Sequence, residues 1–213
     1  MNREDEICDE IMRECPTDFS EFGSAFDRLV KMQHYELPTR LLDITENPLV
    51  ALYFASLPVE RSSNNGQILI YFIPKSEICN HSDQIVTKLS GISFVSEISF
   101  SKAKTNIKQL EDEMNSNNSH IIQLKDEKDF EKTVCVRARK SNPRIIRQHG
   151  AFFLFGAKNG DKAQIADLPF SCFKMDVSHS NKKQILRELE RYGIYEKSLF
   201  PEIDKVAHHI KMH

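Results

Sequence analysis

Apolar residues recur at helical spacing in two segments near the start of the chain, which predicts two helices that each bury one stripe. The stripes consist of Ile7, Ile11 and Met12 in the first segment and of Phe22, Phe26, Leu29, Val30 and Met32 in the second. Pro16 separates the two segments, and Thr17 and Asp18 beyond it are candidate helix caps.

A short strand and a third helix are predicted before residue 58. Leu41 and Leu42 form a short apolar pair that fits a buried strand. Asn47 and Pro48 are typical of a helix start, with Asn47 as the N-cap and Pro48 at the first helical position. The helix should run to about residue 57, before Pro58. Apolar side chains surround most of it, which predicts that it is buried.

Apolar runs bounded by turn residues predict five β-strands after residue 64. They span Gln67–Ile73, Gly91–Phe100, Thr133–Arg139, Ala151–Phe155 and Phe170–Val177. Turn signals occur at 64–66, at Gly156 and at the Lys158-Asn159-Gly160 cluster. Residues 101–130 are polar, which is typical of a short helical or mobile insert.

The chain ends in predicted helices. Ser180 or Asn181 caps the first, and Gly193 ends it in the left-handed conformation with Ile194 placed for the accompanying apolar contact. A last helix begins near Pro201. Helices at both ends of a run of strands predict a single α+β domain over residues 1–213, in which a central, largely antiparallel sheet has flanking N- and C-terminal helices. Residues 1–31 form its N-terminal helical part.

Composition narrows the class of protein. The 213 residues are 40% hydrophobic and 28% charged, an ordinary globular balance, and the formal charge of −2 argues against a dedicated nucleic-acid binder. The five cysteines lack zinc-site spacing and are interpreted as reduced thiols, which favours a cytoplasmic protein. We expect neither secretion nor membrane insertion, because no signal-peptide core or bilayer-length apolar run occurs.

The densest group of polar residues that could carry chemistry lies between residues 33 and 47, interleaved with positions that should be buried. Its members are Gln33, His34, Glu36, Thr39, Arg40, Asp43, Thr45, Glu46 and Asn47. If Leu41 and Leu42 form a buried strand, Arg40 and Asp43 lie at its two ends. Charges there must be paired, hydrated or bound to a ligand.

Two interpretations of this group stay open. In the structural one, Arg40 and Asp43 pair with each other or with Arg147, and Asp43 or Thr45 caps the helix. In the functional one, a ligand lies at the N-terminus of the helix that starts at Pro48, where exposed N–H groups and the helix dipole favour phosphate. Arg40 would then clamp the anion.

A second cluster precedes the predicted strand Ala151–Phe155. Arg144, Arg147, Gln148 and His149 lie there, and Gly150 would let a backbone or ligand approach closely. Side chains at a strand entrance often line a cleft, but an ordinary entrance with solvated basic residues explains the same pattern. The local motifs of dinucleotide-binding proteins, P-loop NTPases, zinc proteases and α/β-hydrolases are absent.

The segment MQHYELPTRLLDITENPLVALYFA, residues 32–55, closely resembles the signature of the FRG domain family. The resemblance continues in QILIYFIP, RIIRQHGAFFLF and LRELERYGIYEKSLFPEID, and covers about residues 26–207. The family is named for an aromatic-Arg-Gly triplet in its N-terminal part, and this sequence has no Arg-Gly pair. Either the chain begins late or this member lacks that element.

A second resemblance concerns the layout of ADP-ribosyltransferases, in which a short strand with a hydroxyl-bearing motif leads into an apolar helix and a late strand carries Glu or Gln. The stretch 43–45 before the helix at Pro48 is similar to the middle element, and Gln148 is nearest to the late one, where no Glu-x-Glu occurs. This resemblance implies NAD as substrate and Asp43 and Gln148 as catalytic residues at an oxocarbenium-like centre.

The ligand-binding residues predicted with it are Gln33, His34, Arg40, Thr45, Asn47, Arg147 and His149. The enzyme would be an effector in a bacterial toxin or phage-defence system. One alternative is a non-catalytic module that uses the same pocket to bind a nucleotide or a partner protein. Another is a nuclease that uses His34, Asp43 and His149. No resident metal site is predicted.

Overall fold

The structure, a computed structural model, describes residues 4–58, 63–95, 112, 130–140, 142–157, 168–202 and 211. The chain divides into two compact units, each built from three stretches of sequence. Unit 1 comprises Met1–Asp43, Lys75–Arg139 and Phe152–Pro169, and unit 2 comprises Ile44–Pro74, Lys140–Ala151 and Phe170–His213. The predicted α+β class is confirmed.

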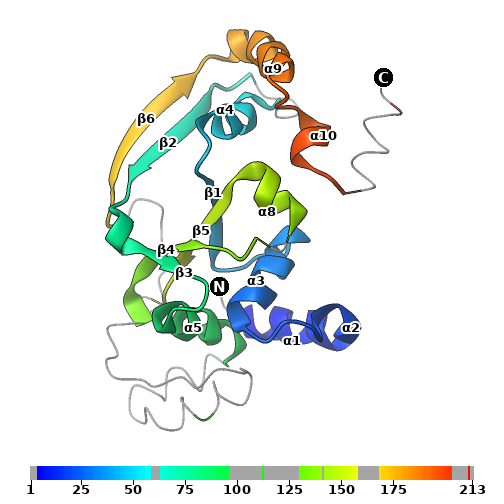
Figure 1. The fold of residues 1–213 in the computed structure, drawn as a ribbon, viewed down its shortest axis with the longest axis vertical. Helices are drawn as coiled ribbons and strands as arrows, with labels where there is room; N and C mark the ends of the chain where they lie inside the picture. The colour runs from blue at the N-terminus through cyan, green and yellow to red at the C-terminus, as the bar shows by residue number, and fades with distance from the viewer. Residues whose placement is uncertain are drawn as a thin grey trace. The chain divides into compact units, whose positions relative to one another are not determined.

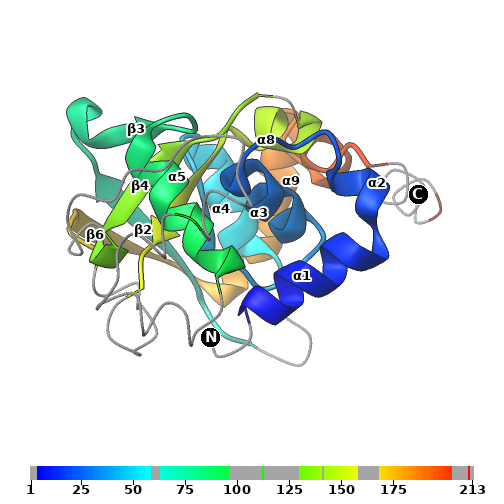
Figure 2. The ribbon, with the colours of Figure 1, turned by 90° about the horizontal axis from the view of Figure 1, so that it is seen from below.

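The described helices of unit 1 are α1 (Glu4–Glu14), α2 (Pro16–Phe19), α3 (Ala25–His34), α5 (Gln84–Gly91) and the 3-10 turns η1 (Lys75–Glu77) and η2 (Ile92–Phe94). In Figure 2, α1, α2 and α3 lie together at the N-terminal end of the chain. Thr17 and Asp18 are not the helix caps that we predicted, because Pro16 starts a short helix of its own that contains both. The cap of α3 is Ser24, whose hydroxyl accepts a hydrogen bond from Asp27 N at 3.1 Å.

A four-stranded sheet has the order β1-β5-β4-β3 (Figure 1). Its strands are β1 (Leu41–Thr45), β3 (Ile78–Asn80), β4 (Thr133–Arg137) and β5 (Gly150–Phe155). β3 pairs with β4 in parallel, and β4 pairs with β5 antiparallel. The core of unit 1 includes the fully buried side chains of Phe26 and Leu29 on α3, Val86 on α5 and Phe153 on β5.

Unit 2 is built from β2 (Gly66–Phe72), β6 (Ser171–Val177), α4 (Pro48–Ser56), α8 (Pro143–Gln148), α9 (Lys182–Arg191), α10 (Glu196–Leu199) and the 3-10 turn η5 (His179–Asn181). β2 and β6 form a two-stranded antiparallel sheet. The core of this unit is a cluster of Val50, Tyr53, Leu189 and Leu199, which joins α4 to α9 and α10. The burial predicted from the all-round apolar sequence of α4 thus holds for Val50 and Tyr53, whereas Leu49 and Phe54 are 41% and 39% exposed.

The predicted end of α9 is confirmed in detail. Gly193 has φ 79° and donates from its N–H to Glu190 O, and Ile194 N donates to Leu189 O, both at 2.9 Å. This is the Schellman arrangement, in which a left-handed residue lets two N–H groups satisfy the last carbonyls of a helix. Ile194 then packs against the cluster around Leu189.

One strand prediction differs from the structure. The predicted strand Gly91–Phe100 is wrong over its described part, because residues 91–94 continue α5 and then form η2, with Ile92 and Phe94 buried. Its alternating apolar positions fit a tight helical turn as well as a strand. Residues 96–100, nearly all of 101–130, the cluster at Lys158 and the helix expected beyond Pro201 lie outside the described residues.

We predict that Gly66→Ala lowers the free energy of unfolding by about 2 kcal/mol. A Cβ at this position would lie 1.9 Å from Ala55 O, a backbone atom at the end of α4 that cannot yield without moving the helix or the strand. The matched control is Gly150→Ala, whose Cβ would meet nothing closer than 3.5 Å. Urea denaturation of both variants should show the loss in the first and a change within about 0.5 kcal/mol in the second.

Candidate functional site

In unit 1, Arg40 makes a buried ion pair with Glu4 of α1. Arg40 Nη2 lies 2.5 Å from Glu4 Oε2 and Nε lies 3.2 Å from Oε1, while the two side chains are only 12% and 9% exposed. Ser93 Oγ bridges the pair, accepting from Arg40 Nε at 2.7 Å and donating to Glu4 Oε1 at 2.9 Å. Two parallel bonds of this kind are the strongest geometry an arginine offers a carboxylate.

The backbone joins the same network. Arg40 N donates to Glu4 Oε1 at 3.2 Å, and Arg40 O accepts from Phe155 N at 3.1 Å. The structural interpretation of Arg40 thus has a geometric basis, although its partner is Glu4 rather than Asp43 or Arg147. An anion at the guanidinium would have to compete with a carboxylate that is already buried beside it.

A second polar group in unit 1 connects the end of α3 to β1. Leu41 N donates to Thr39 Oγ1 at 3.2 Å, and Thr39 Oγ1 donates to Gln33 Oε1 at 2.6 Å. Gln33 Nε2 in turn lies 3.5 Å from Asp43 Oδ2. The predicted residues Gln33 and Asp43 are therefore brought together, in a directional row of hydrogen bonds that ends on an exposed carboxylate.

The end of α3 repeats the Schellman pattern with an unusual residue. Glu36 N donates to Gln33 O and Leu37 N to Met32 O, as the motif requires. The left-handed position, however, holds Glu36 at φ 63°, where glycine is the favoured residue. The neighbouring ring of Tyr35, 65% exposed, packs against His34 with 5.2 Å between the ring centroids.

In unit 2, the end of β1 is bonded to the end of α8. Thr45 Oγ1 donates to Gln148 O at 2.7 Å and accepts from Asn47 N at 3.0 Å, and Glu46 N donates to His149 O at 3.0 Å. The structure thus brings Thr45, Asn47, Gln148 and His149 into one network. In this network the Thr45 hydroxyl and the backbone groups join the end of β1 to the end of α8.

The helix start at Asn47 has its first N–H groups satisfied. Pro48 has none, Leu49 N donates to Asn47 Oδ1 at 3.0 Å, and Val50 N and Ala51 N donate to Asn47 O. The expected phosphate site depended on exposed N–H groups here. Because the Asn47 side chain occupies that role, a phosphate would have to displace it.

The residues before β5 form a helix, α8, rather than the plain strand entrance that we expected. Asn142 Oδ1 accepts from Arg144 N at 2.8 Å and Pro143 follows it, the same start as at Asn47 and Pro48. That Asn-Pro pair was the signal for the helix. Gly150 has room for a methyl group within unit 2, so its lack of a side chain is not required by neighbouring atoms there.

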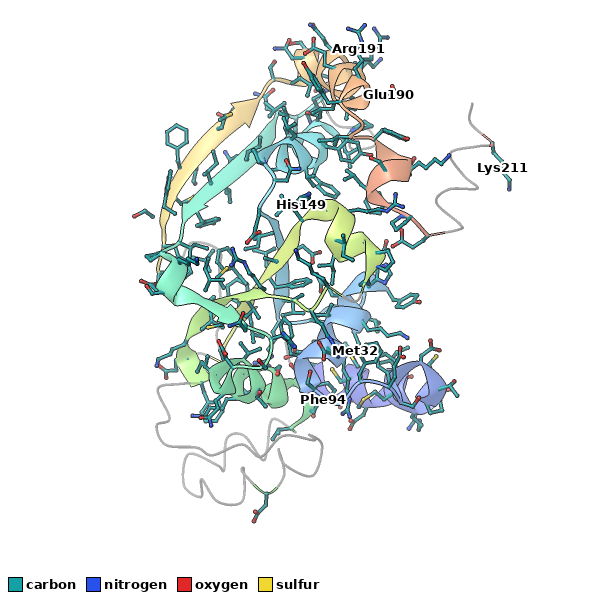
Figure 3. All side chains as sticks on the ribbon, in the orientation of Figure 1. Met32, Phe94, His149, Glu190, Arg191 and Lys211 are labelled. Atoms are coloured by element: carbon teal, nitrogen blue, oxygen red, sulfur yellow. The ribbon has the colours of Figure 1, made fainter. Side chains whose placement is uncertain are left out.

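The side chains of α8 mostly contact α10 and the residue after it. Gln148 Nε2 donates to Leu199 O at 3.2 Å, Arg147 Nη1 donates to Ser198 O at 3.3 Å, and the Arg144 guanidinium lies 4.8 Å from the centre of the Phe200 ring. His149, labelled at the end of α8 in Figure 3, is exposed and left-handed with φ 49°. Two of the three left-handed residues among the described part of the chain thus lie in the two predicted clusters.

Outside these clusters, the thiol of Cys8 is buried and the metal-ligating side chains of the described residues are dispersed. Burial raises the pKa of the Cys8 thiol to about 12, with a further contribution from Glu4, so Cys8 is protonated at neutral pH. Within the described ranges, no group of three metal-ligating side chains comes together. None of the helices in those ranges is long and apolar enough to cross a membrane.

Comparison with known proteins found one matching domain family. Residues 2–64 match the family model of the FRG domain. This segment of the chain is an FRG domain. The match spans α1 to α4 and so includes both partners of the Arg40–Glu4 pair. No curated protein and no solved structure matched the chain.

We predict that Arg40→Met lowers the free energy of unfolding of the chain by about 3 kcal/mol, because it leaves Glu4 buried without its countercharge. The double variant with Glu4→Gln should be clearly less destabilised than the sum of the two single changes. Chemical denaturation of the four proteins in the cycle measures this coupling. Strict additivity would contradict the ion pair.

Glu36→Gly should raise the free energy of unfolding by about 1 kcal/mol, because glycine adopts the left-handed conformation without a Cβ clash. Gly193→Ala is the reciprocal control: its Cβ would meet nothing within 4 Å, so only the conformation penalises it, by about 1 kcal/mol. Thermal denaturation should show opposite shifts. A loss of stability in Glu36→Gly would mean that the Glu36 side chain contributes more than its conformation costs.

Proposed function

We propose that this FRG domain is a non-catalytic nucleotide-binding module, and that the Gln33–Asp43 pair contacts the ligand. The observation that supports this most strongly is the row of hydrogen bonds from Leu41 N through Thr39 to Gln33. It holds the Gln33 amide with its N–H toward the exposed carboxylate of Asp43. Such preorganisation removes rotamer entropy that a ligand would otherwise have to offset.

The chemistry of the pair favours a ligand that offers hydroxyl donors. A carboxylate accepts two hydrogen bonds from a vicinal diol, as acidic residues do from the ribose of dinucleotides. An amide beside it supplies both a donor and an acceptor. A ribose-containing nucleotide such as NAD or ADP-ribose fits this set.

The other predicted site residues already bond to groups of the fold, which favours ligand binding over catalysis. The Gln148 amide, which the transferase hypothesis assigns to the ribose, donates to the backbone of α10, and the Thr45 hydroxyl donates to the backbone of α8. Arg40 is paired with Glu4. Catalysis needs donors that are aimed at the charge developing in the transition state, and these three side chains are aimed at partners within the fold instead.

The ADP-ribosyltransferase hypothesis remains the second candidate because Asp43 is an exposed carboxylate that could stabilise an oxocarbenium-like centre. The sequence predicted Gln148 as its second catalytic residue and His34, Arg147 and His149 as ligand contacts. Asp43 and His34 belong to unit 1, whereas Arg147, Gln148 and His149 belong to unit 2. A role as a toxin or phage-defence effector rests on the family resemblance.

We expect NAD, ADP-ribose or ATP to raise the melting temperature of the chain saturably, because a ligand of the folded state stabilises it. Asp43→Asn keeps the shape of the side chain but removes its charge, and should weaken binding by about tenfold or more. The matched control is Glu188→Gln, a carboxylate-to-amide change on the exposed face of α9. A thermal-shift titration of the three proteins measures the effect.

Equal binding by wild type and Asp43→Asn would contradict the proposal, as would no response to any nucleotide. Nicotinamide release from NAD separates the two candidates. Saturable binding without release supports the module, whereas release that is abolished in Asp43→Asn and in Gln148→Ala supports the transferase.

A further inference from the structure

Strand β6 presents an open edge in unit 2. Among the described strands its only neighbour is β2, so one side of β6 has backbone N–H and C=O groups with no strand beside them (Figure 1). Residues 171–176 are all exposed. An exposed edge of this kind is a ready template for pairing with another chain.

The same ribbon carries an exposed apolar row. Phe173 and Met175 are 59% and 45% exposed, and Phe72 at the far end of β2 is 67% exposed. Phe173 is paired with Ile70, and Met175 with Ile68, so all of these side chains lie on one face of the ribbon. A two-stranded ribbon is marginal by itself and gains stability from additional strands.

The sequence of β6 is complementary to itself in one antiparallel register. When Met175 of one copy lies opposite Met175 of a second copy, Lys174 lies opposite Asp176 on both sides of the two-fold axis. In the same register Phe173 lies opposite Val177. Charges therefore meet opposite charges on one face, and apolar side chains meet apolar side chains on the other.

Neighbouring two-fold registers lack this match. Centring the axis on Lys174 places the two lysines opposite each other, which is destabilising, and centring it on Asp176 does the same with two aspartates. Centring it on Phe173 leaves Lys174 opposite Cys172. Within one chain, Lys174 is paired with Leu69 and Asp176 with Gln67, so neither charge has an opposite charge across the ribbon.

We infer that β6 pairs with β6 of a second copy of this chain, joining the two ribbons into one four-stranded sheet with the order β2-β6-β6-β2. The pairing is isologous, as a two-fold axis requires. It extends the row of Phe173 and Met175 across the axis, and it satisfies the edge of β6 in both copies.

Charge reversal tests the register on the intact chain. Lys174→Glu places glutamate opposite Asp176 twice per dimer, and Asp176→Lys places lysine opposite Lys174 twice. Each should raise the dissociation constant of the dimer at least tenfold, as measured by sedimentation equilibrium. The double variant restores opposite charges in swapped positions and should return the constant to within about threefold of wild type.

Crosslinking gives a second measurement that does not depend on affinity. In a Cys172→Ser background, Met175→Cys places two thiols across the axis, and a short bis-maleimide should trap a covalent dimer. Lys183→Cys on α9 is the control and should stay monomeric. A wild-type chain that is monomeric at millimolar concentration would overturn the inference, as would a dimer in which Lys174→Glu and Asp176→Lys have no effect.

Discussion

Unit 1 depends on the buried contact between Arg40 and Glu4. It joins α1 to the start of β1, and through Ser93 it reaches the turn that follows α5. Removing both charges from water is costly, and the cost is offset because two hydrogen bonds join the side chains, Ser93 bridges them and the Arg40 N–H, just before β1, donates to Glu4. Such a contact permits few alternative arrangements of the three elements.

The polar residues on either side of Arg40 in the sequence are likewise hydrogen bonded within the fold. Gln33 and Thr39 are held in one row in unit 1, while Thr45 and Gln148 bond to backbone in unit 2. These groups first stabilise the irregular chain between helices and strands, where backbone donors and acceptors would otherwise be unpaired. The left-handed Glu36 and His149 show that the fold tolerates strain in both places.

Local chemistry explains which elements could be predicted. The Asn47-Pro48 start, the apolar surface of α4 and the Gly193 ending of α9 each depend on residues within one or two turns, so the pattern contains the whole cause. The strand predicted from Gly91 failed because burial under neighbouring elements, rather than period alone, decided its conformation. The helix α8 was missed although Asn142 and Pro143 carried the same signal as Asn47 and Pro48.

The sequence by itself determined the α+β class, most element positions, the FRG resemblance and the two clusters in which polar residues gather. Only the tertiary structure decided what those residues do, because their partners are far away along the chain. Glu4 lies 36 residues from Arg40, and Thr45 lies 103 residues from Gln148. The sequence shows that a buried charge or hydroxyl needs a partner. Which residue is that partner depends on the distant segments that folding brings together.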